Sequence, residues 1–296
     1  MSDSYIYKLV RSIQQGNTIL FVGAGISRNL GLPSYGELIN QLSEDLGFDS
    51  EIYQILGNGD PLTLAEYYVL KQGSLVPLLE KFQNQWTVPI KEVKASRVHE
   101  LIAKLNFPII YTTNYDNGLE LAFEEYSPNT HYHKIADVGD IACSNGCDTQ
   151  IIKFHGDMET TDESSIVLTE SSYFERLNFD SPLDIKFRSD ILGKSILFLG
   201  YSLNDINIRL LLHKLNATWK IFHSSTVRPP SYMFLTSPNE IQETILRSRG
   251  IIPIVSKNPD PKEGTIEFLE RVFEGTGKLN TKDRVSYFQI EGTIKK

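Results

Sequence analysis

Short apolar runs rich in β-branched and aromatic residues recur along this chain, with segments of helical periodicity between them. The runs are Thr18–Val22, Pro108–Thr112, Ile151–Phe154, Ser195–Leu199, Tyr232–Leu235 and Ile251–Val255. Nearly continuous apolarity over four or five residues is typical of strands that are covered on both faces of a parallel sheet. Amphipathic helices are expected over roughly 35–47, 61–83, 96–105, 116–125, 182–193, 204–216, 238–249 and 264–274. This alternation predicts a doubly wound α/β fold.

The spacing of the runs predicts the domain organisation. About 85 mostly helical residues separate the first two runs, more than one crossover needs, so we expect a helical insertion over 34–105. Residues 126–150 contain several turn formers and are expected to form an irregular loop. The whole of 1–275 is predicted to be one domain with a mostly parallel, Rossmann-like sheet, and 276–296 a C-terminal tail.

Composition narrows the class of protein. The chain has 296 residues, 41% of them hydrophobic and 22% charged, which is typical of a globular protein. Its formal net charge of −8 argues against direct binding to nucleic acid or to a membrane surface, because both are negatively charged. No apolar run is long enough to span a bilayer, and the first residues lack the apolar core of a signal peptide. With only two cysteines, a reducing cytoplasm is the expected location.

A glycine-rich turn, Gly23-Ala24-Gly25-Ile26-Ser27, follows the first run directly. Glycines at a strand-to-helix turn let backbone N–H groups approach a phosphate. The turn does not match the G-x-G-x-x-G dinucleotide pattern, because Arg28 occupies the third glycine position, and no GK[ST] follows it. A plain tight turn after a buried strand therefore remains an alternative for these residues.

Polar residues also follow three later runs. Asn114 and Asp116 come after the second run, His155 after the third, and Ser202 after the fourth. The carboxyl ends of strands form the ligand-binding edge of an open α/β sheet, so these side chains are candidates for one site. Each also has a structural alternative: Asx residues form turns, a histidine can be a hydrogen-bonded core residue, and a serine can simply begin a helix.

Taken together and in this order, the four segments resemble the sirtuin family. GAGIS with Gly-Leu-Pro at 31–33 resembles its first signature, TTNYD at 112–116 its Q-N-x-D element, His155-Gly156 its catalytic His-Gly, and Gly200-Tyr201-Ser202 its ribose-contacting segment. The segments PSYGEL, TTNYD and GYSLNDIN are more similar to the bacterial sirtuin-like NADases of anti-phage defence, of which the effector of the Thoeris system is one. The resemblance implies an NAD+ hydrolase that releases nicotinamide and ADP-ribose.

The resemblance also implies roles for individual residues. His155 would be the base that acts on a ribose hydroxyl or on the attacking water, and Asn114 would fix the ribose and that water. Asp116 would contact the nicotinamide end or orient Asn114. NAD contacts are implied for the glycine turn and for two later strand ends: Gly23, Ala24, Gly25, Ser27, Thr113, Gly200 and Ser202.

One departure from the family bears on the reaction. Protein-deacylating sirtuins hold a structural zinc with two Cys-x-x-Cys pairs, whereas this chain has only Cys143 and Cys147, which precede His155. A mixed site with His131 and His133 is a weaker alternative, so no metal is expected. Because the zinc module helps to shape the acyl-peptide groove, its absence favours hydrolysis by water over deacylation.

Two other functions stay open: a protein deacylase, and a module that binds NAD or ADP-ribose without turnover. Unregulated NAD hydrolysis would poison the host. We therefore expect control in trans, by a separately encoded sensor or by assembly into a homo-oligomer.

Overall fold

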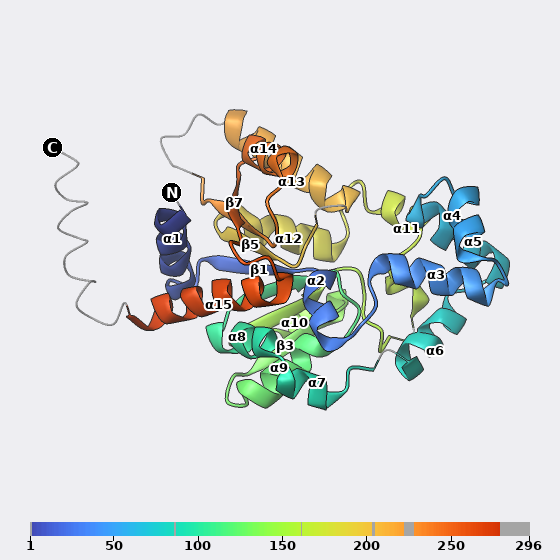
Figure 1. Cartoon of the computed structure of the whole chain (residues 1–296), viewed down its shortest axis with the longest axis horizontal. Coiled ribbons are helices and arrows are strands. Elements are labelled where there is room, and N and C mark those ends of the chain that lie inside the picture. The colour runs from blue at the N-terminus through green and yellow to red at the C-terminus, as the bar shows by residue number, and fades with distance from the viewer. Residues whose placement is uncertain (1, 86, 161, 203–204, 222–227, 279–296) are drawn as a thin grey trace.

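The computed structural model describes residues 2–85, 87–160, 162–202, 205–221 and 228–278 (Figure 1). Within these residues seven strands form one sheet in the order β3-β4-β2-β1-β5-β6-β7, and every neighbouring pair is parallel. The strands are β1 (Thr18–Val22), β2 (Ile109–Thr112), β3 (Tyr132–Ile135), β4 (Thr149–Lys153), β5 (Ser195–Leu199), β6 (Ser231–Leu235) and β7 (Ile251–Val255). The predicted doubly wound, parallel α/β fold is confirmed.

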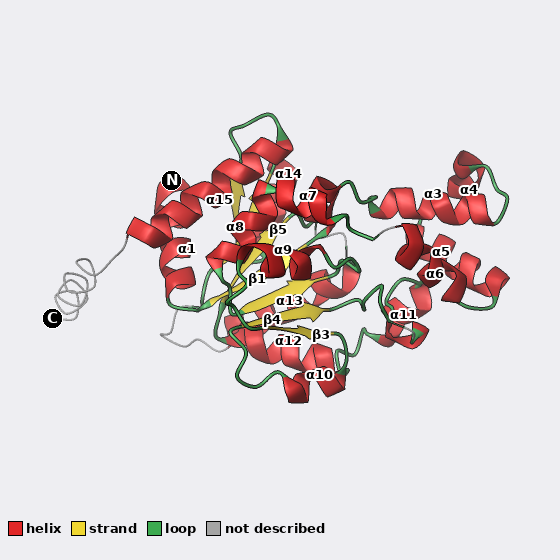
Figure 2. Ribbon diagram, turned by 90° about the horizontal axis from the view of Figure 1, so that it is seen from below, coloured by secondary structure: helices red, strands yellow, loops and turns green. Residues whose placement is uncertain are grey.

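Helices cover both faces of the sheet, as Figures 1 and 2 show. Side chains alternate along each strand, so Leu20 and Val22 join one apolar core while Ile19 and Phe21 join the other. The first core is completed by α1 (Ser2–Gln14), α7 (Ile90–Ala95), α8 (Arg97–Leu105), α9 (Gly118–Tyr126) and α15 (Pro261–Lys278). The second is completed by α10 (Val138–Cys143), α12 (Pro182–Leu192), α13 (Ile206–Ile221) and α14 (Glu240–Ser248).

A third core belongs to a helical cluster beyond the carboxyl ends of the strands (Figure 1). The cluster consists of α3 (Tyr35–Asp45), α4 (Ser50–Leu56), α5 (Pro61–Gln72) and α6 (Val76–Gln85), joined by apolar side chains from 158–168. The short helix α11 (Glu170–Glu175) packs on α5, where the backbone N–H of Ser171 donates to Glu66 at 3.0 Å. Helices α7 and α8 share the core of the sheet instead, so the range 34–105 spans two packing environments.

Three local features differ from expectation. Residues 126–150 were expected to be irregular, which is wrong, since they contain β3 and α10. β3 lies at the sheet edge and buries only Ile135 fully, so it lacks the apolar run that marks the other strands. The expected helix over 61–83 is divided at Gly73, whose left-handed φ of +79° ends α5. Helix α1 was not predicted, although Ile6, Leu9, Val10 and Ile13 have helical spacing.

The strand order reverses at β1, which lies between β2 and β5. Ligands bind open α/β sheets at such a switch point, outside the carboxyl ends of the strands. The turn that follows β1 is formed by α2 (Ala24–Ser27) and the 3-10 helix η1 (Arg28–Leu30). A second 3-10 helix, η2 (Glu163–Ser165), lies in the segment after β4.

Helix α15 extends to Lys278, so the predicted tail at 276–296 lies mostly outside the described residues. No described helix has the length and apolarity to cross a membrane.

Candidate active site

The glycine turn after β1 is interlocked with the turn after β5. The N–H of Gly23 donates to the Leu199 carbonyl at 3.0 Å, and the N–H of Gly25 donates to the Gly200 carbonyl at 2.9 Å. A Cβ at Gly23 would lie 2.5 Å from the Gly200 oxygen, and Gly200 itself has a φ of +62°. Close approach of the two turns thus explains these glycines, and two of the amides expected to bind phosphate already have protein acceptors.

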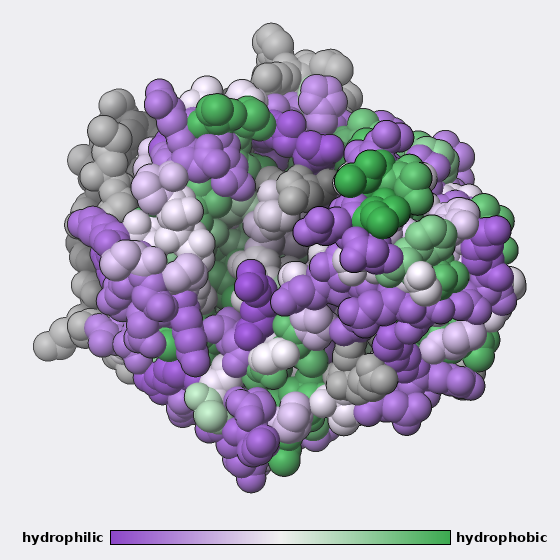
Figure 3. All heavy atoms as spheres, turned by 45° about the vertical axis from the view of Figure 1, so that its right-hand side comes forward, coloured by the Kyte–Doolittle hydropathy of each residue, from purple (hydrophilic) through white to green (hydrophobic). Residues whose placement is uncertain are grey.

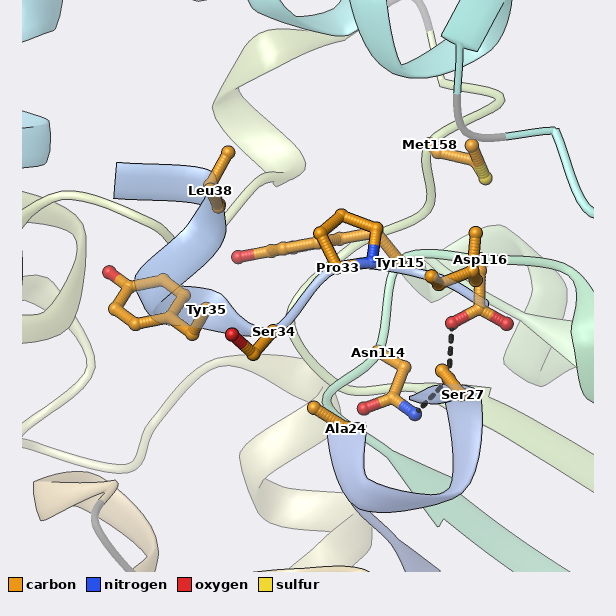
Figure 4. A pocket seen from close by; sticks show the side chains of 11 residues that line it. Ala24, Ser27, Pro33, Ser34, Tyr35, Leu38, Asn114, Tyr115, Asp116 and Met158 are labelled. Carbon is orange, nitrogen blue, oxygen red and sulfur yellow. Dashed lines mark hydrogen bonds between the residues drawn. The ribbon is translucent and has the colours of Figure 1, made fainter. Parts of the chain in front are cut away.

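Three polar side chains from two strand ends are linked by hydrogen bonds. Asn114 Nδ2 donates to Ser27 Oγ at 2.8 Å, and Ser27 Oγ donates to Asp116 Oδ2 at 2.6 Å (Figure 4). The other oxygen of Asp116 accepts the N–H of Gly118, the first residue of α9, at 2.9 Å. Asp116 therefore has both oxygens occupied, and the Ser27 hydroxyl transmits its orientation to the Asn114 amide.

These residues line an open pocket between the carboxyl ends of the strands and α3 (Figure 4). Its wall is formed by Ala24, Ser27, Leu32, Pro33, Ser34, Tyr35, Leu38, Asn114, Tyr115, Asp116 and Met158. The lining is mainly apolar, with the Asn114–Ser27–Asp116 chain as its convergent polar group, a composition typical of small-molecule sites.

The helical cluster supplies one side of this pocket because α3 begins there. Ser34 and Glu37 form a capping box: the Ser34 hydroxyl accepts the Glu37 N–H at 3.3 Å, and the Glu37 carboxylate accepts the Ser34 N–H at 2.6 Å. Tyr35 and Tyr115 donate hydrogen bonds to the carbonyls of Leu168 and Val167, at 3.2 and 2.8 Å. The segment after β4 thus holds two tyrosines of the pocket wall in place, while α3 forms one side of the pocket.

His155 is buried directly after β4, with 4% of its surface exposed, and does not line the pocket. Its Nε2 lies 3.0 Å from Asp205 Oδ2, and its ring packs edge-on to Tyr173 with centroids 5.4 Å apart. Gly156 has a φ of +96°, and a Cβ there would lie 2.7 Å from the Ser165 carbonyl, so the glycine of the His-Gly pair is required by the backbone.

A buried ion pair lies beneath the Asn114 loop. Lys153, the last residue of β4, is fully buried, and its Nζ lies 2.9 Å from Glu120 Oε1 and also donates to the Asp116 carbonyl. Burial raises the pKa of Glu120 although Lys153 opposes that rise. Burial also opposes the charge of Lys153, but the nearby carboxylates of Glu120, Asp157 and Asp116 outweigh it and raise the pKa of the ammonium.

A second buried histidine lies near Asp116. His99 is 1% exposed, and its Nδ1 is 2.7 Å from the Ser96 hydroxyl. Burial lowers the pKa of His99 to about 4, against the opposing charge of Asp116. His99, Lys153, Glu120 and Asp205 were not singled out as site residues, because only the tertiary structure brings them to the carboxyl edge.

The other expected NAD-binding residues lie around the pocket rather than in its wall. Thr113 is half-buried beside Asn114, Gly200 is half-buried at the switch point, and Ser202 is exposed. Residues 203–204, which follow Ser202, lie outside the described residues. Among the residues that the structure describes, no three His, Cys, Asp or Glu side chains are grouped to hold a metal; Cys143 is exposed, and Cys147 donates to the Ser144 carbonyl.

Comparison with known proteins finds a family match for the region that holds most of the sheet. Residues 108–254, from β2 to β7, match the model of the SIR2-like domain family. This region is therefore similar to SIR2-like domains. The sirtuin resemblance of the sequence is thereby confirmed, and the Asn114 loop, His155 and the turn after β5 all lie within the matched SIR2-like region.

Several curated relatives of this chain have names that state an activity. It is 33% identical over 212 residues to the NAD(+) hydrolase ThsA of Enterococcus faecium, covering 70% of this chain and 41% of that protein. The NAD(+) hydrolase ThsA of Bacillus cereus is 26% identical, with 74% of this chain and 44% of that protein covered. The Defense-associated sirtuin 2 of Bacillus subtilis is 26% identical over 81% of this chain and 23% of its own length. The chain thus spans less than half the length of these relatives.

Proposed function

We propose that this SIR2-like domain hydrolyses NAD+ at the bond between nicotinamide and ribose, releasing nicotinamide and ADP-ribose. The observation that carries the proposal is the hydrogen-bonded chain Asn114–Ser27–Asp116 in the pocket wall at the topological switch point. The names of the relatives support NAD+ as the substrate and anti-phage defence as the setting.

The chemistry requires groups that orient the ribose and activate water as the glycosidic bond breaks. The transition state has oxocarbenium character, so a fixed acceptor near the ribose stabilises it more than the ground state. Because Asn114 Nδ2 donates a hydrogen bond to Ser27, the amide is held in one orientation, and its Oδ1 is available to accept from a ribose hydroxyl or from the water. Asp116 then acts through Ser27 as the residue that orients Asn114.

His155 is proposed as the general base. It lies at the end of β4, beside the strand that carries Asn114, so the ribose must extend from Asn114 toward that strand end. Contacts to the pyrophosphate and to the second ribose are proposed for Ala24, Ser27, Thr113 and Ser202, and close backbone approach for the glycines at 23, 25 and 200. An imidazole can accept and return a proton near neutral pH, as this role requires.

We further propose that activity is controlled through assembly, either of several copies or with a separately encoded sensor. Exposed apolar side chains gather on the helical cluster: Ile52, Ile55 and Leu56 of α4 and Leu70 of α5 are 53%, 74%, 66% and 73% exposed. Figure 3 turns this side toward the viewer and shows green apolar areas among hydrophilic ones. Such patches are typical of protein interfaces. Ile55→Glu should change the mass measured by light scattering, alone or with the products of neighbouring genes; an unchanged mass in both settings would contradict this proposal.

The function is tested by nicotinamide release, followed by liquid chromatography, with the protein alone and with the products of its neighbouring genes. His155→Ala and Asn114→Ala should each lower the rate by roughly 10²- to 10⁴-fold. His131→Ala replaces an exposed histidine outside the site and should leave the rate unchanged. Wild-type rates in both site variants would overturn the assignment. NAD+ that stays intact in every setting would favour a binding module, and cleavage only with an acylated peptide would favour a deacylase.

A further inference from the structure

Asp205 has two separate tasks at the start of α13. Its Oδ1 accepts the N–H of Ile208 at 3.1 Å, as an N-cap residue does, and its Oδ2 lies 3.0 Å from His155 Nε2. Both side chains are almost fully buried, with 6% of Asp205 and 5% of His155 exposed. Among the residues that the structure describes, neither Asp205 Oδ2 nor His155 Nε2 has a hydrogen bond of standard geometry, so the polar contact between these two atoms is the 3.0 Å ion pair.

A helix cap by itself does not require a charge here. Asn and Ser cap helices about as well as Asp does, and neither carries the desolvation cost of a buried carboxylate. Burial disfavours the charged form of Asp205, yet the adjacent His155 and the N–H groups of the α13 terminus outweigh burial, and the pKa of Asp205 lies below its ordinary value. A buried carboxylate that stays ionised beside one imidazole indicates a role toward that imidazole.

We infer that Asp205 is a positioning residue for His155: its carboxylate accepts the Nε2–H, fixes the ring in that tautomer, and leaves Nδ1 as the atom that accepts a proton. When Nδ1 takes the proton of a ribose hydroxyl or of the attacking water, the ring becomes an imidazolium whose charge Asp205 balances. The oxygen that loses the proton keeps the electron pair, so no further reactant is needed. This inference rests on the proposed hydrolysis of NAD+.

The described groups around Asp205 are mostly neutral phenols. Four tyrosines approach from four elements: Tyr35 from α3, Tyr115 after β2, Tyr173 from α11 and Tyr201 after β5. Burial and the charge of Asp205 raise the pKa of all four phenols above the ordinary value, so they stay neutral at working pH.

Two of the described cations lie near these tyrosines. Arg176 lies near Tyr173 but pairs with Asp184, and Arg209 lies near Tyr201 and is exposed. The backbone around Asp205 is held in place as well, because Asn207 Nδ2 donates to the Tyr173 carbonyl at 3.1 Å.

The test is Asp205→Asn, which keeps an N-cap acceptor for Ile208 and removes the charge. Its nicotinamide release should show a kcat lowered by at least about 100-fold with KM for NAD+ within about threefold of wild type. The acid limb of its pH–rate profile should move to lower pH by roughly one unit, because the imidazolium is no longer stabilised. Asp49→Asn makes the same change at the N-cap of α4, a helix of the helical cluster, and should keep wild-type kinetics.

Asp205→Ser is the second variant, since it also keeps a cap and removes the charge. A shift of the acid limb in both variants supports the inference. A pH–rate profile like that of the wild type overturns the inference. So does a lower kcat without a shift of the acid limb in the two variants, because it would mean that Asp205 serves the fold alone. If the wild type releases nicotinamide and His155→Ala does not, such a result leaves the proposed function standing. ¹⁵N shifts of the His155 ring give a readout independent of turnover: Nε2–H is expected in the wild type, and Nδ1–H there would also overturn the inference.

Discussion

Replacing Lys153 by methionine removes the cation of a fully buried ion pair and leaves Glu120 in place. Lys153 is 0% exposed, Glu120 is 6% exposed, and their charged atoms are 2.9 Å apart. Breaking a buried pair by removing one partner costs about 3–5 kcal/mol, because the remaining charge is uncompensated. Since a domain is stabilised by only about 5–15 kcal/mol in all, Lys153→Met should bring the protein close to its folding limit.

The same variant should show a characteristic pH dependence. Burial already raises the pKa of Glu120 in the native protein, and losing Lys153 raises it further. An acid whose folded-state pKa is raised takes up a proton more readily when folded, so it stabilises the fold as pH falls. The free energy of unfolding that Lys153→Met loses should therefore be larger at pH 8 than at pH 5.

Urea unfolding followed by circular dichroism measures these changes, with Glu120→Met/Lys153→Met as the matched control. The double variant removes both charges, and apolar replacement of a buried pair is often close to neutral, so it should recover at least about 1–2 kcal/mol relative to Lys153→Met. A loss below about 1 kcal/mol in Lys153→Met, or no recovery in the double variant, would refute this account of the pair.

Three further outcomes follow from single side chains. Gly23→Ala places a Cβ 2.5 Å from the Gly200 carbonyl oxygen and should cost roughly 1–3 kcal/mol in urea unfolding. Gly36→Ala on α3 would place its Cβ 4.0 Å from Ser34 Oγ, an ordinary contact, and should stabilise the protein by about 0.5–1 kcal/mol; equal effects of the two variants would contradict the interlocked turns. Ser34→Ala removes the capping box of α3 and should cost about 1 kcal/mol, seen as a lower Tm; no change would show that the box is dispensable. Burial lowers the pKa of His99 to about 4, so below the ordinary pKa of histidine the unfolded chain binds a proton that the folded chain does not. The free energy of unfolding should therefore fall by up to about 3 kcal/mol from pH 7 toward pH 4. His99→Gln should flatten this pH dependence, and an unchanged pH dependence in that variant would contradict the role of His99.

Much of the fold could be predicted from local patterns. Every described strand except β3 contains an apolar run. Five of these six strands lie inside the sheet and are covered on both faces, and the sixth, β7, lies at the other end of the sheet but is still mostly buried. β3 was missed because an edge strand with one buried side chain has no such run. The division of α5 from α6 depends on the left-handed backbone at Gly73, which the helical periodicity of 61–83 conceals.

The candidate site was predictable only as a set of strand ends. The sequence shows that Asn114 and Asp116 follow β2 and that His155 follows β4. A parallel sheet brings the carboxyl ends of these strands to the same side of the sheet. The hydrogen bonds from Asn114 through Ser27 to Asp116 are not predictable in this way, since they join residues 87 and 89 positions apart.

Local sequence patterns are enough to predict the alternation of strands and helices, and the polar residues that follow the strands. Which of those residues contact one another depends on the tertiary structure. It joined the glycine turn to the turn after β5, gave the pocket a wall from α3, and placed Asp205 beside His155. The physical reason is that strand and helix patterns repeat over a few residues, whereas these contacts depend on how distant strand ends meet, which is set by packing across the whole sheet.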